Sequence, residues 1–291
     1  MATPHTRVVN VFTVNGRGGN PATITLDADP LSSAEMQQIA RHAGHECGFV
    51  CQPPAGSGVD AVLRFFVPRH EMEMCGHATV GALWLLHRLG RLPHDRDRVQ
   101  ISTLSGAVTG RIDPRGTPEA RIAISQPSGE IAPLPDPAAQ TREIAAVLGI
   151  APGDLASRPI VNARTSRVKT LVPLASADAV HALRPDFARV EAVCEAIGST
   201  GLYPYAAVDL ERRIFEARQF PKASGYPEDA ATGIAASALA FGLVEHGLVT
   251  ASDAGVSIYP GRAMGQLSRI AVAFQQGAAG CWITGDVTEP A

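Results

Sequence analysis

The sequence predicts an α+β protein of two pseudo-equivalent lobes. With 291 residues, the chain is long enough for one or two domains with a sizeable core. β-rich segments alternate with helix-like segments in both halves. The halves also share a pattern, in which a strand leads through Phe and Pro to a loop, an Ala-Thr pair and an apolar helix. It occurs in LRFFVPRHEMEMCGHATVGALWLL (63–86) and in EARQFPKASGYPEDAATGIAASALAFGL (216–243).

The spacing within this repeat is nearly the same in both halves. Arg64 lies 15 residues before Thr79, and Arg218 lies 14 residues before Thr232. Chance similarity between short apolar segments is the alternative explanation. If the repeat is genuine, each lobe points one helix N-terminus at a common cleft, and that cleft is the natural ligand site.

The first half is predicted to contain strands, two helices and a hairpin. Its β-rich segments predict strands at 7–14, 22–28, 46–54 and 60–68, with a glycine turn at 15–21. A helix over 31–44 is indicated by Ser32 or Ser33 as its cap and Gly44 as its end. The apolar run 78–89 predicts a second helix, which a glycine ends. The segments RVQISTLSGAVTGRI and EARIAISQP predict a β-hairpin.

The second half is predicted to follow a Pro-rich polar link, SQPSGEIAPLPDPAAQ (125–140). Its predicted helices lie near 141–149, 176–183 and 187–197 and in IAASALAFGLVEHG. Its predicted strands are TSRVKTLVPL (165–174), GLYPYAAVDL and RIFEARQFP. We therefore expect an N-terminal lobe of residues 1–125, completed by a C-terminal strand at about 278–291, and a C-terminal lobe of residues 126–277.

Composition and charge exclude several classes of function. Apolar residues make up 45% of the chain and charged residues 18%, as in a typical soluble globular protein, and the net charge is −3. This balance offers no basic surface for nucleic acid or for an anionic membrane. No apolar run reaches the ~18 residues that span a bilayer, and the five scattered cysteines fit reduced thiols better than disulfides. We expect a soluble, cytoplasmic protein.

The motif MCGHATVG places Cys75 and His77 directly before an apolar helix. A metal site needs three or four ligands at workable spacing, and no second Cys/His cluster accompanies these two, so we predict no metal. Cys75 could be a nucleophile, or it could pack as a small apolar residue while a backbone group satisfies His77. Alternatively, the free N–H groups after Gly76 could hold an anion with help from the helix dipole.

The second helix start, YPEDAATGIAAS, allows a similar choice. Asp229 could simply be an N-cap, which contributes about 1 kcal/mol. It could instead belong to a ligand site, together with the start of the first apolar helix. The occurrence of two such helix starts at matched positions favours the ligand site.

Glu46 lies in AGHECGFV, between a helix end and an apolar strand. It could be an exposed turn carboxylate. At the surface of a cleft it would instead be partly desolvated, which raises its pKa and suits it to proton transfer near neutral pH. The glycine-rich GRGGNP (16–21) lacks the P-loop and dinucleotide-binding patterns, and the chain has no GxSxG or HExxH motif, so we predict no cofactor.

Taken together, the segments resemble the phenazine-biosynthesis PhzF-like family, whose fold is that of diaminopimelate epimerase. The matching segments occur in the family order and are VFTVNGRGGNPATITLDADPLSSAEMQQIAR, LRFFVPRHEMEMCGHATVGALWLL, PEDAATGIAASALA and GRAMGQLSRIAV. The resemblance implies two lobes, each a mostly antiparallel sheet wrapped around a central helix, and a homodimer. It also implies a cofactor-independent isomerase of secondary metabolism that shifts a proton on a small carboxylate-bearing metabolite.

By position, the resemblance assigns catalytic roles to Glu46, His77 and Asp229. Glu46 matches the family's proton-shuttling glutamate, and His77 matches the histidine of Gly-His-Pro or Gly-His-Ala. Asp229 matches the aspartate of Glu-Asp-Pro-Ala-Thr-Gly. The implied substrate-binding residues lie at the two helix starts and are Cys75, Gly76, Ala78, Thr79, Ala230, Ala231, Thr232, Gly233 and Ile234.

Three departures from the family pattern fall in the expected pocket. His45 stands where the family usually has Ser, and Ile234 stands where Ser usually follows Ala-Thr-Gly. The loop TSRVKT lacks the usual Gly. These changes suggest a substrate other than that of the phenazine pathway.

Two rival functions remain open. Proline racemases and diaminopimelate epimerases share the fold and use one cysteine at each helix start. Cys75 fits the first position, but Ala230 occupies the second, which argues against a two-thiol racemase. An epimerase that uses Glu46 with Cys75 is the enzymatic alternative. A non-catalytic binding protein is suggested by His45 and Ile234, whereas the intact catalytic set argues against it.

Overall fold

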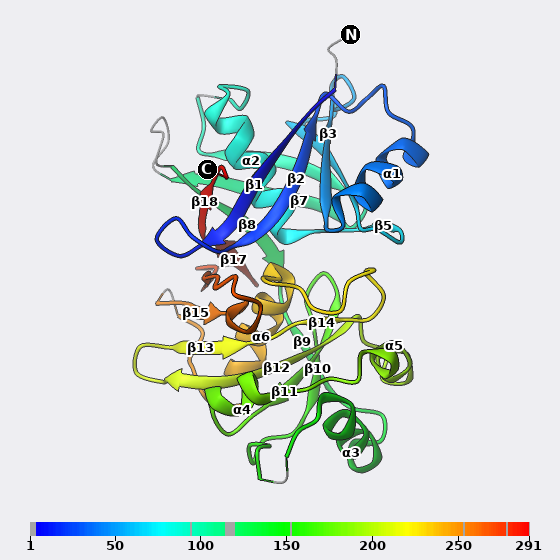
Figure 1. Ribbon diagram of the computed structural model, residues 1–291. Coiled ribbons are helices and arrows are strands. Elements are labelled where there is room, and N and C mark those ends of the chain that lie inside the picture. Colours follow the sequence, from blue (N-terminus) through cyan, green and yellow to red (C-terminus); the bar gives the residue numbers. More distant parts are fainter. Residues whose placement is uncertain are drawn as a thin grey trace.

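The computed structural model describes residues 4–290 except 94, 114–119, 152, 253 and 278. Two lobes are stacked one above the other, with the first half of the chain in the upper lobe (Figure 1). Most of the second half forms the lower lobe, and the last strand, red in Figure 1, returns to the upper lobe.

The upper lobe is a sheet with one helix at its centre and one against its side. Its strands are β1 (His5–Thr13), β2 (Asn20–Leu26), β3 (Cys47–Cys51), β4 (Ala61–Phe66), β5 (Glu71–Met72), β6 (Arg98–Thr103), β7 (Gly106–Asp113) and β8 (Arg121–Pro127). The side helix α1 (Ser33–Ala43) starts at a capping box of Ser32 and Glu35 and ends at a left-handed Gly44. The central helix α2 (Gly76–Arg88) packs against β1, β2, β3 and β8.

The lower lobe has the same plan, with α6 (Gly233–Glu245) as its central helix. The other helices of this half are α3 (Pro137–Leu148), α4 (Ala177–Ala182), α5 (Phe187–Ala196) and a short 3-10 turn at Arg262–Met264. The strands are β9 (Glu130–Pro133), β10 (Val161–Arg164), β11 (Val168–Pro173), β12 (Gly201–Asp209), β13 (Ile214–Ala217), β14 (Phe220–Pro221), β15 (Val256–Tyr259), β16 (Ile270–Phe274), β17 (Gly280–Thr284) and β18 (Asp286–Thr288).

The two halves repeat one strand-pairing scheme. In the upper lobe, β1–β2 is antiparallel, β2–β3 parallel, β3–β4 antiparallel and β4–β6 parallel. The lower lobe repeats the same order of pairings in β10, β11, β12, β13 and β15. The predicted α+β fold of two pseudo-symmetric lobes is confirmed, so the repeated sequence pattern reflects a repeated structure.

Two strands cross between the lobes. β8 and β17 pair antiparallel and join the two sheets. β9 follows β8 in the chain and pairs with β10 in the lower lobe. β18 follows β17 and pairs with β1 in the upper lobe. The segment 125–140 is therefore not an irregular link, because it holds the end of β8, all of β9 and the start of α3. The lobe boundaries stay a prediction, and the boundary residues 1, 278 and 291 lie outside the described residues.

The central helices are enclosed because small residues allow the sheets to approach them closely. A Cβ on Gly81 of α2 would lie 2.9 Å from a methyl carbon of Val9, and a Cβ on Gly242 of α6 would lie 2.2 Å from one of Leu171. A helix that is apolar on all sides is stable only when it is buried. Each lobe therefore wraps its sheet around one such helix.

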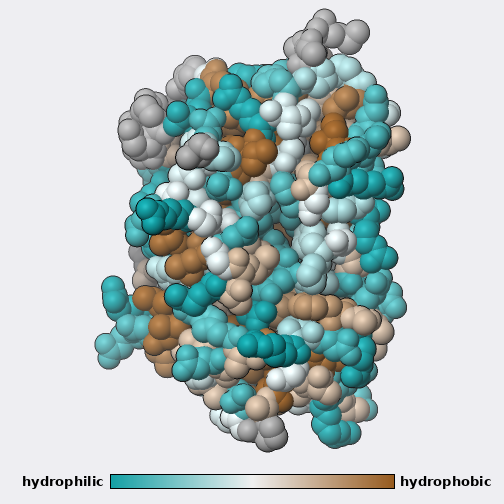
Figure 2. All heavy atoms as spheres, viewed as in Figure 1, coloured by the Kyte–Doolittle hydropathy of each residue, from teal (hydrophilic) through white to brown (hydrophobic). Residues whose placement is uncertain are grey.

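The helices do not suit a membrane span. No helix in the described part of the chain is long and apolar enough to cross a bilayer. On the face seen in Figure 2, the coloured residues show hydrophobic side chains in separate clusters among hydrophilic ones. The two most apolar helices, α2 and α6, have 13 residues each and bury their side chains within the lobes.

Candidate active site

The N-termini of α2 and α6 meet between the lobes. A Cβ on Gly76 would lie only 3.5 Å from Cα of Gly233, so the two helix starts approach each other at glycines. The first intrahelical bonds are donated by Thr79 and Ala236. The amides at 76–78 and 233–235 therefore have no carbonyl partner within their helices, and two positive dipole ends converge.

A cleft beside these helix starts is lined by both lobes. The empty space within it and at its mouth, open solvent included, amounts to about 440 Å³. The upper lobe contributes Glu46 and His77, and the lower lobe contributes Lys169, Tyr226 and Asp229. Ionisable side chains from distant parts of the chain are thus collected around one small volume.

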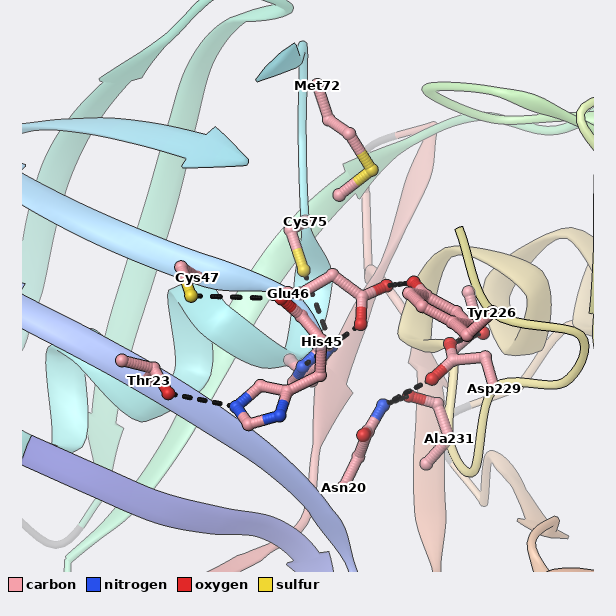
Figure 3. Close-up of polar contacts among 12 residues, drawn as sticks. Asn20, Thr23, His45, Glu46, Cys47, Met72, Cys75, Tyr226, Asp229 and Ala231 are labelled. Carbon is pink, nitrogen blue, oxygen red and sulfur yellow. Dashed lines mark hydrogen bonds and ion pairs between the residues drawn. The ribbon is translucent and has the colours of Figure 1, made fainter. Parts of the chain in front are cut away.

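Glu46 follows the turn that ends α1 and comes directly before β3. Its side chain reaches toward the lower lobe, where the hydroxyl of Tyr226 donates a hydrogen bond to Oε1 (Figure 3). The residue is 7% exposed. Burial and the negative charge of Asp229 raise the pKa of Glu46 to about 8. This carboxyl can therefore both release and accept a proton near neutral pH.

His77 lies in the first turn of α2 and is 2% exposed. Its Nδ1 lies 3.3 Å from Sγ of Cys75, whereas its Nε2 lies 4.0 Å from Oε2 of Glu46, which is too far for a hydrogen bond. Nε2 therefore has no hydrogen-bond partner among the described residues. Burial lowers the pKa of His77 to about 4, so the ring is neutral at pH 7 and presents one unpaired nitrogen near Glu46.

Asp229 is held by donors from both lobes. Its Oδ1 accepts a hydrogen bond of 2.6 Å from the side-chain amide of Asn20, which also donates to the carbonyl of Ala231 at 3.0 Å (Figure 3). Its Oδ2 accepts a hydrogen bond from the hydroxyl of Thr232. Thr232, not Asp229, is the N-cap residue of α6. The alternative that Asp229 simply caps this helix is therefore wrong.

The predicted catalytic residues Glu46, His77 and Asp229 all line this cleft. The predicted substrate-binding residues that also line it are Cys75, Gly76, Thr232, Gly233 and Ile234. Those that do not line it are Ala78, Thr79, Ala230 and Ala231. In Thr79, for example, both the amide and the hydroxyl donate to the carbonyl of Cys75, at 3.1 and 2.7 Å. The functional roles of all these residues stay predictions.

Several polar residues of the cleft were not predicted from the sequence. They are Asn20, Arg167, Lys169, Gln219 and Tyr226. Asn20 belongs to the predicted glycine turn at 15–21, and Tyr226 stands three residues before Asp229, so their positions offered a signal. Arg167 and Lys169 lie in TSRVKT, a segment already expected at the pocket, although neither residue was singled out. Gln219 offered no signal, because a strand pattern does not show which residue reaches a cleft.

The three departures from the family pattern differ in their position. Ile234 lines the cleft, and so do Arg167 and Lys169 of the TSRVKT segment, of which Lys169 belongs to β11. His45 does not line the cleft, because its ring turns to the upper lobe, where Nε2 lies 2.9 Å from the hydroxyl of Thr23 (Figure 3). The expectation that His45 lies in the pocket is therefore corrected, and it touches the site only as the neighbour of Glu46.

Glu46, Cys75 and His77 bring three potential metal ligands together. One ligand atom of each lies within 4.8 Å of the others, and all three residues are buried. The sequence spacing had suggested only two ligands, Cys75 and His77. Glu46 is distant from them in the sequence, and only the fold brings it close to them. Three ligands suffice for an open zinc-type site. Burial raises the pKa of Cys75 well above its usual value, so a metal would have to displace a firmly held proton. The absence of a functional metal stays a prediction.

Similar proteins match almost the whole chain. The family model PhzC-PhzF, described as phenazine biosynthesis-like protein, matches residues 9–286. An uncharacterized isomerase of Deinococcus radiodurans is 32% identical over 276 residues, which cover 92% of this chain and 87% of that protein. The trans-2,3-dihydro-3-hydroxyanthranilate isomerase of Pseudomonas aeruginosa is 30% identical over 243 residues, which cover 82% of this chain and 79% of that protein.

A solved structure has the same architecture. The PhzF-family phenazine biosynthesis protein of Bacillus anthracis aligns with a TM-score of 0.83 and 26% identity. The alignment covers 100% of this chain and 98% of the other. The likeness therefore includes both lobes and the strands that cross between them.

Proposed function

The chain belongs to the PhzC-PhzF family of phenazine biosynthesis-like proteins, and on this basis we propose that it shifts a proton between two carbons of a small carboxylate-bearing metabolite without a cofactor. It is an isomerase, with about 30% identity over most of its length to several family isomerases. The proposal concerns the reaction type and the residues that perform it.

The reaction needs one group that removes a proton and returns it elsewhere. Ionised Glu46 takes a proton from one carbon of the substrate, and the electron pair of the broken C–H bond spreads over the conjugated system. The protonated carboxyl then donates this proton to another carbon of that system. The product is an isomer of the substrate, so no oxidant, reductant or leaving group is required.

The other groups of the cleft stabilise the charge that develops on the substrate. The free amides at the starts of α2 and α6 suit a substrate carboxylate, because they combine N–H donors with two positive dipole ends. Neutral His77 offers Nε2 to a polarised oxygen or nitrogen of the substrate. Asp229, fixed by Asn20 and Thr232, can accept a hydrogen bond from a substrate hydroxyl or amino group.

The position of Glu46 is the observation that carries this proposal. Its carboxyl is buried, accepts a hydrogen bond from Tyr226, has a pKa of about 8 and lines the same cleft as the two helix starts and Asp229. Perturbed carboxyls in clefts are typical of general acid–base catalysts. A carboxyl with a purely structural role would not need to line the cleft, as Glu46 does.

The test is the loss of proton transfer in Glu46→Gln. Wild type, Glu46→Gln and the surface control Glu195→Gln would be incubated in D₂O with small unsaturated carboxylates, first trans-2,3-dihydro-3-hydroxyanthranilate, and followed by NMR. We expect deuterium incorporation by wild type and the control, and a loss of about 10²–10⁴-fold in Glu46→Gln. Turnover by Glu46→Gln within a few-fold of wild type would remove Glu46 from the mechanism.

A further inference from the structure

Lys169 is a buried cation in the cleft. The chain has only two lysines, and the other, Lys222, is partly exposed and lies 3.2 Å from a carboxylate oxygen of Glu195. Lys169 comes from β11, is 4% exposed and lines the cleft. Burying an ammonium group is costly unless a partner compensates for the lost water. Lys169 is therefore expected to need an anionic or hydrogen-bonding partner in the cleft.

The neighbouring carboxylates do not supply that partner. Within the described residues, no carboxylate oxygen lies within 4.0 Å of Nζ of Lys169, and Nζ makes no hydrogen bond. Both oxygens of Asp229 already accept hydrogen bonds from Asn20 and Thr232, and Oε1 of Glu46 accepts one from Tyr226. The donors of Lys169 thus remain available to a ligand.

A second unpaired group lies beside this lysine. Gln219 is 1% exposed and lines the cleft, and neither its side-chain oxygen nor its nitrogen has a partner among the described residues. A Cβ on Gly201 would lie 2.3 Å from Nε2 of Gln219 and 3.3 Å from Nζ of Lys169. The two donors therefore lie next to each other against Gly201, where a side chain would displace them, and both line the cleft.

We propose that Lys169 and Gln219 form a second anion-binding subsite of the cleft, and that the substrate is a small molecule with two carboxylates. This inference rests on the proposed function, in which the starts of α2 and α6 hold the first carboxylate. The second carboxylate accepts one hydrogen bond from Nζ of Lys169 and one from Nε2 of Gln219. Such charge-assisted bonds are stronger than bonds between neutral groups.

The charge around the subsite favours an anion. Arg167 also lines the cleft, and its charge acts on Lys169, so a second cation lies near the subsite. Burial and the nearby charge of Arg167 lower the pKa of Lys169 to about 7. A bound carboxylate would favour the ammonium form and relieve the repulsion between the two cations.

The first experiment compares ligands that differ by one carboxylate. Acetate and malonate, propionate and succinate, and butyrate and glutarate would be titrated into wild type, Lys169→Met and the control Lys222→Met. In wild type and the control, at least one dicarboxylate is expected to bind about tenfold more tightly than the monocarboxylate with which it is paired. In Lys169→Met this preference is lost. Equal binding within every pair in wild type, or a preference that persists in Lys169→Met, would overturn the subsite.

The second experiment needs no substitution. Protein labelled with ¹⁵N at the lysine side chains has two Nζ signals, which the Lys222→Met variant assigns. The preferred dicarboxylate should shift the Lys169 signal and leave that of Lys222 unchanged. An unmoved Lys169 signal on addition of saturating dicarboxylate would contradict the proposal.

The same titration in Glu46→Gln separates this inference from the proposed reaction. Binding to Lys169 does not require proton transfer, so Glu46→Gln should keep the dicarboxylate preference. If Glu46→Gln keeps its turnover, the proposed reaction fails while the binding result stands. If the preference is absent but Glu46→Gln is inactive, the subsite fails and the reaction stands.

Discussion

Burial gives Glu46 and His77 pKa values on opposite sides of neutrality. The carboxyl has a pKa of about 8 and the imidazole one of about 4, and desolvation is the largest cause of both shifts. Near pH 7 most of the carboxyl therefore carries its proton, while the imidazole carries no charge. Two neutral groups stand where two charged groups would be costly. In the proposed reaction the ionised fraction of Glu46 acts as the base, and neutral His77 faces the negative charge that develops on the substrate.

The raised pKa of Glu46 predicts how stability depends on pH. In the unfolded chain Glu46 ionises around its usual value of 4.5, but in the folded protein it keeps its proton up to about 8. Its contribution to stability is therefore present at low pH and is lost as the pH rises through this window, by up to about 1.4 kcal/mol per pH unit. The glutamine side chain of Glu46→Gln cannot ionise, so this variant does not lose stability for that reason as the pH rises.

We expect the free energy of unfolding of Glu46→Gln to rise relative to wild type between about pH 5 and about pH 8. Urea denaturation of both proteins across this range measures the difference. Parallel curves for the two proteins would show that the folded protein does not raise the pKa of Glu46.

Substitutions at the two helix starts distinguish an isomerase from a thiol-dependent epimerase. Cys75 contacts His77 through Sγ and Nδ1 at 3.3 Å, but burial raises the pKa of its thiol, which disfavours the reactive thiolate. We expect Cys75→Ser and Cys75→Ala to keep at least about a tenth of the turnover. His77→Ala and Asp229→Ala should lose about 10²-fold or more.

Turnover and solvent-deuterium exchange of the four purified variants provide the measurement. An inactive Cys75→Ser together with an active Asp229→Ala would establish the epimerase mechanism instead.

The sequence predicted the residues at the helix starts but not the residues that hold them. Glu46, His77 and Asp229 stand beside recognisable helix ends, so local pattern and family resemblance could locate them. The donor to Asp229, Asn20, is 209 residues away in the chain, and the donor to Glu46, Tyr226, is 180 residues away. Contacts of this kind arise only when the lobes meet, and no local pattern encodes them.

Equivalent strands of the two lobes carry equivalent ion pairs. Arg64 of β4 donates two hydrogen bonds to Glu71, at 2.7 and 2.8 Å. Arg218, which directly follows β13, donates two to Glu228, both at 2.8 Å. Both arginines belong to the repeated sequence pattern, which explains the matched spacing to Thr79 and Thr232. The environments differ, because the Arg64 side chain is 27% exposed and that of Arg218 is 8% exposed.

This difference predicts unequal losses of stability for the two matched substitutions. Arg218→Met leaves Glu228, whose side chain is only 10% exposed, without its partner. It also removes donors to the carbonyls of Val180 and Leu183, so we expect a loss of about 3–5 kcal/mol. Arg64→Met breaks a partly exposed pair and should cost about 1 kcal/mol or less. Urea denaturation followed by circular dichroism compares them, and equal losses would contradict the role of burial.

Long elements were predicted from the sequence better than short ones. The apolar runs that became α2 and α6, and the capped α1, carry a signal over many residues. The four-residue strands β10 and β15 were not predicted, because so short a segment has little alternation and depends on its neighbours for stability. β9 was also not predicted, because its Pro-rich sequence is typical of a link between lobes. In the structure it pairs with β10 along its whole length.

The assembled protein is expected to be a homodimer that holds no metal or nucleotide. The family resemblance motivates the dimer, and the absence of nucleotide-binding motifs from the sequence motivates the second expectation. Native mass spectrometry should give twice the chain mass without an added ligand, and EDTA should leave turnover unchanged. Stoichiometric zinc in the purified protein would contradict this and would give Glu46, Cys75 and His77 a role as ligands.

The crossing of β9 and β18 has a consequence during protein synthesis. β1 is synthesised long before β18, the strand that completes its pairing. A nascent chain that lacks Asp286–Thr288 has only β2 to pair with β1 and leaves the other edge of that strand open. Open edges favour pairing with foreign strands. Most of the upper lobe is therefore translated before the lower lobe, but its sheet is completed only after β18 has been made.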